Sequence, residues 1–105
     1  MKAKQQTLSQ AFYNVIIETI RTRRQRPGIQ YANDPQLMFE AVRDVVVSHP
    51  NLFLAEIEID RIYKDISEEV KRYLQDHSKH VKTKDYTFVL VEIKAMLHQM
   101  KNKTV

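Results

Sequence analysis

Four arginines lie within six residues near the start of the chain, in the run Arg21-Thr22-Arg23-Arg24-Gln25-Arg26. A guanidinium group presents a fork of N–H donors that matches the oxygens of carboxylates and phosphates. One or two cations are enough to complement the dipole at the C-terminus of a helix, and four exceed that need. The run therefore predicts a site for anionic groups on a partner protein, a lipid headgroup or a nucleic acid. The alternative is a decorated helix end that only complements acidic residues of the same chain.

Two histidines, His77 and His80, lie three residues apart beside Asp76. This spacing lets two imidazoles face one metal ion on a helix, but a third ligand must come from elsewhere. The lysines that flank the pair also repel a cation. We therefore expect a solvent-exposed, basic helix end and no metal site.

Carboxylates are frequent in the middle of the chain, where a pair of them could perform acid–base catalysis. On a helix, Glu58 and Asp65 would lie two turns apart with Arg61 and Lys64 between them, which is typical of an exposed face with ion pairs. The chain has one glycine and no cysteine. Neither a glycine-rich phosphate loop nor a thiol nucleophile can be built from it. We expect no enzymatic activity and no cofactor.

The charges fall into three blocks along the sequence. Residues 1–26 carry six Lys/Arg and one acid, residues 27–70 carry three and nine, and residues 71–105 carry eight and three. The two basic ends should pack beside the acidic middle, and the net charge of +4 leaves positive charge for an outside partner. With 105 residues, 43% of them hydrophobic, the chain should form one globular domain.

Hydropathy predicts neither a membrane span nor a secretion signal. The longest purely apolar runs, residues 52–55 and 88–91, have four residues each, far fewer than the roughly 20 that cross a bilayer. Polar residues follow the basic N-terminus where a signal peptide needs an apolar stretch. These features favour a cytoplasmic protein.

Apolar side chains recur at steps of three and four residues in four segments, which predicts four helices. Thr7 and Gln10 have the spacing of a capping box for the first helix. Asp34 should cap the second helix with Pro35 in its first turn, and Asn51 should cap the third. Short links between the segments predict an all-α fold, a small antiparallel four-helix bundle. The expected helices span about 7–25, 35–48, 52–78 and 85–101.

Three stretches also carry strand signals. Residues 45–47 are β-branched, residues 56–60 alternate between polar and apolar, and residues 86–91 have strand propensity. We favour helix because the helical period continues beyond each stretch. A break at Ser67 in the third helix stays possible.

Residues 73–86, YLQDHSKHVKTKDY, read as an aromatic and leucine-containing helix end, a short basic link and the start of an amphipathic helix that continues to Leu90, Ile93 and Leu97. Earlier in the chain, residues 34–38, DPQLM, place an acid and a proline at the expected start of the second helix. In this order of elements the chain resembles the immunity proteins that accompany pediocin-like (class IIa) bacteriocins. Chain length, positive charge and the expected four helices also agree.

The resemblance implies a cytosolic, non-enzymatic protector that acts at the membrane-embedded sugar-transport receptor used by the bacteriocin. Its partners would be a protein, such as a membrane receptor complex, and an anionic membrane surface. Each Lys or Arg near such a surface contributes about 1 kcal/mol of binding free energy. The contacts that we expect come from cations near both ends of the chain: Arg21, Arg23, Arg24, Arg26, Lys94, Lys101 and Lys103.

Two other functional classes stay open. A basic nucleic-acid-binding or regulatory adaptor of phage or plasmid type would use the same arginines on phosphates, and its binding would weaken steeply with salt. A structural bundle that binds a partner would instead use an exposed patch at residues 52–54 or at Phe88. The oligomeric state stays open in all three cases.

Overall fold

The computed structural model describes residues 7–101, and the predicted all-α four-helix bundle is confirmed. The three stretches with strand signals are helical. Residues 1–6, for which the sequence predicts no secretion signal, and residues 102–105 lie outside the described range. The elements are α1 (Leu8–Arg24), the 3-10 helix η1 (Tyr31–Asn33), α2 (Asp34–Val47), α3 (Glu56–Asp76) and α4 (Thr83–His98).

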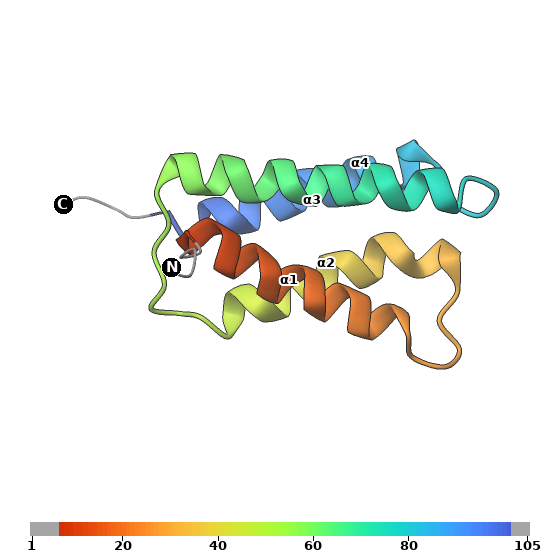
Figure 1. Cartoon of the computed structure of the whole chain (residues 1–105), viewed down its shortest axis with the longest axis horizontal. Helices are drawn as coiled ribbons and strands as arrows, with labels where there is room; N and C mark the ends of the chain where they lie inside the picture. The colour runs from red at the N-terminus through yellow and green to blue at the C-terminus, as the bar shows by residue number, and fades with distance from the viewer. Residues whose placement is uncertain (1–6, 102–105) are drawn as a thin grey trace, which may run out of the picture.

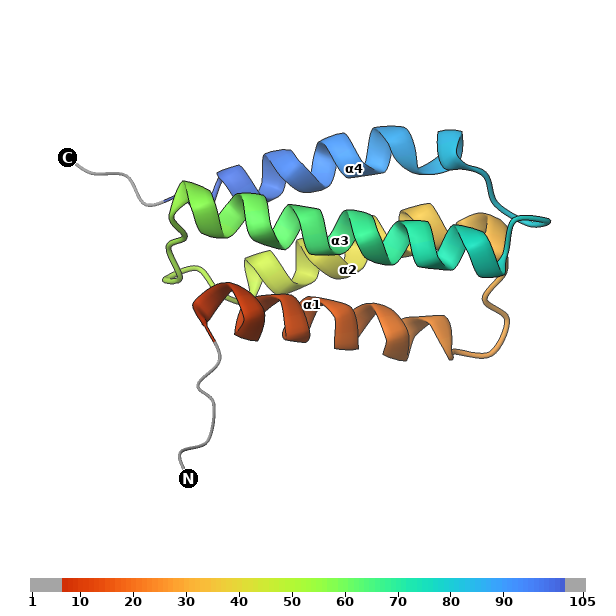
Figure 2. The same ribbon diagram turned by 45° about the horizontal axis from the view of Figure 1, so that its top comes forward.

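Consecutive helices run in opposite directions, as the colour gradient shows (Figure 1). α1 packs against α2 and α3, and α4 packs against the same two helices. The neighbours α1 and α3 therefore run parallel, as do α2 and α4 (Figure 2). The loops 25–33 and 77–82 share one end of the bundle, called here the loop end, and residues 48–55 cross the opposite connector end.

The core lies along the bundle axis and draws apolar side chains from all four helices. α3 shows the pattern most simply, because Ile59, Ile62, Ile66 and Val70 follow one another at steps of three and four residues and are all buried. None of the helices in residues 7–101 combines the length and the apolar character that a membrane span requires.

The start of the third helix differs from the expectation. α3 begins at Glu56, not near residue 52, so Asn51 does not cap it. Leu54 is fully buried, and its backbone N–H donates to the Met100 carbonyl at 2.7 Å. Because Leu54 is fixed in this way, residues 52–55 are not helical. The helix starts directly after Ala55, whose N–H donates to the Glu58 carboxylate at 2.8 Å. From there α3 continues unbroken through Ser67.

The first two helix starts give one confirmation and one correction. Thr7 Oγ1 accepts the Gln10 N–H at 3.2 Å while Gln10 Oε1 accepts the Thr7 N–H at 3.1 Å, which is the predicted capping box. Asp34 does not cap α2, since Asn33 holds the capping position and Asp34 is the first helical residue. The Asp34 side chain is 1% exposed because its carboxylate turns into the bundle.

Candidate binding site at the loop end

α1 carries the arginine run to the loop end, where helical rotation of about 100° per residue sends the side chains in different directions. Arg24 turns inward and is 13% exposed, whereas Arg21 is 60% exposed. Arg23 lies over α2, and Arg26 lies exposed in the turn after α1. The four cations therefore do not act as one cluster.

Arg24 is paired inside the protein. Its Nε and Nη2 donate to the two carboxylate oxygens of Asp34 at 2.8 and 3.0 Å, and Nη1 donates to Glu69 at 3.1 Å. The Tyr86 hydroxyl donates to Asp34 at 2.6 Å. These four residues, called here the buried network, come one from each helix. Arg24 has no free face for an outside anion, so we remove it from the candidate site.

Aromatic rings extend the buried network into both loops. The Arg24 guanidinium lies 3.9 Å from the centroid of the Tyr73 ring, and burial raises the pKa of Tyr73 to about 12. Tyr31 stacks on His80 and also contacts His77, with 4.5 Å between ring centroids in each pair. The two histidines thus pack on an aromatic ring. Within residues 7–101, no group of three or more His, Cys, Asp or Glu side chains is placed to hold a metal ion.

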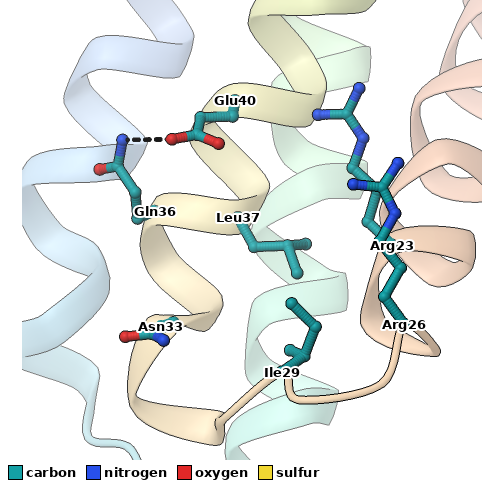
Figure 3. A pocket seen from close by; sticks show the side chains of 7 residues that line it. All are labelled: Arg23, Arg26, Ile29, Asn33, Gln36, Leu37 and Glu40. Carbon is teal, nitrogen blue, oxygen red and sulfur yellow. Dashed lines mark hydrogen bonds between the residues drawn. The ribbon is translucent and has the colours of Figure 1, made fainter.

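Arg23 and Arg26 line a groove of about 280 Å³ between the end of α1 and the start of α2, called here the arginine groove. The two arginines form one side, and Gln36 and Glu40 on α2 form the other (Figure 3). Between them, the side chain of Ile29 points toward that of Leu37 (Figure 3). The full lining is Arg23, Arg26, Ile29, Asn33, Gln36, Leu37 and Glu40.

The two arginines keep free hydrogen-bonding capacity. Arg23 Nη2 donates to Asp44 at 2.6 Å, and this hydrogen bond lowers the pKa of the Asp44 carboxyl group. Within residues 7–101, the other N–H groups of Arg23 have no hydrogen-bond acceptor, and Arg26 has no carboxylate within 4.0 Å. On the opposite wall, Glu40 Oε2 accepts a hydrogen bond from Gln36 Nε2 at 3.0 Å. The groove is therefore cationic on one side and hydrogen-bond accepting on the other.

The other predicted contacts lie apart from the groove. Arg21 Nη2 is 3.6 Å from Glu69 Oε1, and the Lys94 ammonium lies 5.2 Å from the centroid of the Tyr63 ring. Lys101 pairs with Glu56 at 2.8 Å at the connector end. Lys103 lies outside the described residues. The predicted cations are thus spread over the length of the bundle, and two of them meet in the groove.

The α2 wall of the groove was missed by the sequence reasoning. Asn33, Gln36, Leu37 and Glu40 have the spacing i, i+3, i+4 and i+7, which places them on one face of a helix. Such a mixed polar face is common on exposed helices. Its only distinguishing feature is that the preceding loop brings it beside the arginines.

Comparison with protein-family models, curated proteins and solved structures finds no match to this chain.

Proposed function

We propose that this chain is a non-enzymatic immunity protein of the kind that accompanies pediocin-like bacteriocins. It would protect the producer cell by binding a partner at the cytosolic face of the membrane. The resemblance in residues 34–38 and 73–97 supports this proposal, and the four-helix bundle agrees with it. The observation that carries it is the arginine groove, in which two guanidinium groups stay available for an outside anion.

The charge around the groove favours an anionic partner surface. The two loops at this end carry Arg26, Lys79 and Lys82 and no acidic residue. All three are exposed. Near an anionic leaflet each such cation gains about 1 kcal/mol, so the loop end is suited to work beside a membrane without an apolar anchor.

The buried network supports a binding role over catalysis. A general acid or base must reach the proton that it transfers, within about 3 Å or through one water. Asp34 and Tyr86 are both 1% exposed. Asp34 already accepts hydrogen bonds from Arg24, and the Tyr86 hydroxyl already donates to Asp34. We assign this network to holding the helices together.

A protection assay tests the proposal directly. A bacteriocin-sensitive strain would express the full chain and be challenged with a panel of pediocin-like bacteriocins. We expect survival against at least one member, and loss of that protection in the double variant Arg23→Gln/Arg26→Gln. The matched control is Lys64→Gln/Lys71→Gln, which removes two exposed cations of α3 and should keep protection. If the strain that expresses the unchanged chain stayed sensitive to every bacteriocin of the panel, the proposal would be contradicted.

The nucleic-acid adaptor remains a competing prediction for the same arginines. A mobility-shift titration at two salt concentrations separates it from immunity, because phosphate contacts weaken steeply as salt rises. A salt-sensitive shift that Arg23→Gln/Arg26→Gln abolishes, together with no protection, would favour the adaptor.

The structural partner-binding bundle draws support from α4. Phe88 is 72% exposed and Val91 is 60% exposed, one turn apart on the outer face of this helix. In the other patch that the sequence suggests, Leu54 is buried and Phe53 alone is well exposed, at 58%. A dimer in size-exclusion chromatography that Phe88→Ser dissociates would support this second candidate.

A further inference from the structure

The charge balance of the arginine groove selects ligands with a single negative charge. Arg23 and Arg26 supply two positive charges, Glu40 supplies a negative charge on the facing wall, and Asp44 partly neutralises Arg23 from outside. A phosphate monoester carries about 1.5 to 2 negative charges near neutral pH. Its extra charge would face Glu40, whereas a carboxylate carries only one charge and fits a guanidinium fork.

The apolar floor of the groove favours a ligand with an apolar group next to its carboxylate. Leu37 is buried and Ile29 is 41% exposed, and their side chains point toward each other between the two polar walls (Figure 3). Covering Ile29 would remove apolar surface from water, which is favourable in proportion to the area covered. A ligand that places an aliphatic side chain here would gain affinity in addition to its ion pair.

The facing wall supplies acceptors for an N–H group. Glu40 has acceptor sites left after its bond from Gln36, because an ionised carboxylate can accept about four hydrogen bonds. Asn33 lines the groove from the same side. The groove thus offers guanidinium groups, an apolar floor and N–H acceptors within about 280 Å³.

The last residue of a polypeptide carries all three complementary groups on one Cα: a free carboxylate, a side chain and a backbone N–H. We propose that the arginine groove binds the free C-terminus of a partner polypeptide whose last side chain is aliphatic. This inference rests on the proposed function as a partner-binding protein and names the part of the partner that is bound. The small volume suits the end of a chain better than a folded surface.

Peptide binding to the intact protein tests this inference. The probe is a fluorescein-labelled hexapeptide that ends in leucine, compared with the same peptide carrying a C-terminal amide. Amidation removes the charge that the arginines contact, so we expect affinity to fall on the order of tenfold to 100-fold. Ending the free-acid peptide in aspartate should also weaken binding, because a second carboxylate would face the apolar floor.

Variants of the protein locate the contact. Arg26→Gln should lower affinity for the free acid toward that of the amide, and Arg26→Lys should retain part of it because the charge remains without the fork. The matched control Lys71→Gln removes an exposed cation outside the groove and should leave the affinity unchanged. Acetate competing as strongly as the hexapeptide would show that a carboxylate alone suffices and would overturn a polypeptide ligand.

Three further results would overturn the inference: no measurable binding of any peptide, equal affinity for acid and amide, or displacement by inorganic phosphate at lower concentration than by acetate. Failure here is distinguishable from failure of the proposed function. Protection in the challenge assay without peptide binding would leave immunity standing and reject the C-terminal ligand. Peptide binding without protection would support the C-terminal ligand and reject immunity.

Discussion

Asp34 belongs to α2 and accepts hydrogen bonds from two other helices, from Arg24 on α1 and Tyr86 on α4. Its carboxylate satisfies a guanidinium that would otherwise be buried with only Glu69 for a partner. Removing one member of a buried ion pair leaves an uncompensated charge, which is costly. The identity of this one side chain therefore bears on the stability of the whole loop end.

We expect Asp34→Asn to lower the free energy of unfolding by about 3 kcal/mol. Urea denaturation followed by circular dichroism measures this loss. Asp44→Asn is the matched control, since it removes a carboxylate from Arg23 at the surface, where Asp44 is 45% exposed. The control should cost far less, and equal losses in the two variants would contradict the role of the buried network.

The tyrosines of the same region predict a loss of stability in alkali. Burial, and then the neighbouring Asp34, raise the pKa of Tyr73 to about 12 from its ordinary 10.0. Burial, and then the hydrogen bond to Asp34, also raise the pKa of Tyr86. The unfolded chain releases these protons first, so stability is complete below pH 10 and falls as the pH rises from 10 toward 12.

Urea midpoints at pH 8, 10 and 11 measure this decline. The double variant Tyr73→Phe/Tyr86→Phe should be less stable than the wild type at pH 8, since it loses the hydroxyl bond to Asp34. Its midpoint should then change less between pH 10 and 11. A decline as steep as that of the wild type would show that other groups cause the alkaline loss.

The four helices could be predicted because each carries an apolar stripe whose helical period continues beyond any strand-like stretch. The stripes do not show that residues 52–55 are non-helical, because this apolar run would also fit the first turn of a helix. Leu54 leaves the helical path because it packs in the core and its backbone bonds to Met100, which is 46 positions later in the sequence. Local spacing cannot report a contact of that range.

The same limit applies to the candidate site. The arginine run is visible in the sequence, but its division between the interior and the surface depends on distant partners. Arg24 turns inward to Asp34 and Glu69, which are 10 and 45 positions away. Arg26 stays available because no carboxylate of residues 7–101 reaches it. The sequence therefore predicts the groove's cationic side and not its α2 wall.

Substitutions in the connector test how residues 52–55 are anchored. Leu54→Ala should lower the free energy of unfolding by about 2–5 kcal/mol, because it removes a fully buried side chain and leaves a cavity. The neighbouring Phe53→Ala removes a larger side chain that is 58% exposed. Such surface changes usually stay within about 0.5 kcal/mol. A larger loss for Phe53→Ala than for Leu54→Ala would contradict the anchoring of the connector.

Within residues 7–101, the connecting segments at the two ends of the bundle differ in charge. The loops of the loop end contain Arg26, Lys79 and Lys82 without an acid, whereas residues 48–55 of the connector contain no Lys, Arg, Asp or Glu. Arg24 adds no free charge to the loop end, because it is paired with Asp34 and Glu69. If the protein works beside a membrane as proposed, this asymmetry should orient it with the loop end toward the anionic leaflet.

Vesicle binding tests this orientation. The triple variant Arg26→Gln/Lys79→Gln/Lys82→Gln should bind vesicles rich in anionic lipid on the order of 100-fold more weakly at low salt, since each cation contributes about 1 kcal/mol. The control Arg61→Gln/Lys64→Gln/Lys71→Gln removes three exposed cations from α3, so both variants lose the same net charge. Equal weakening in a sedimentation assay would mean that net charge alone drives binding. A larger loss of binding in the loop-end variant would assign the membrane contact to that end. This difference between the variants should become smaller as salt is added, because the Debye length falls from about 10 Å at 0.1 M to about 3 Å at 1 M.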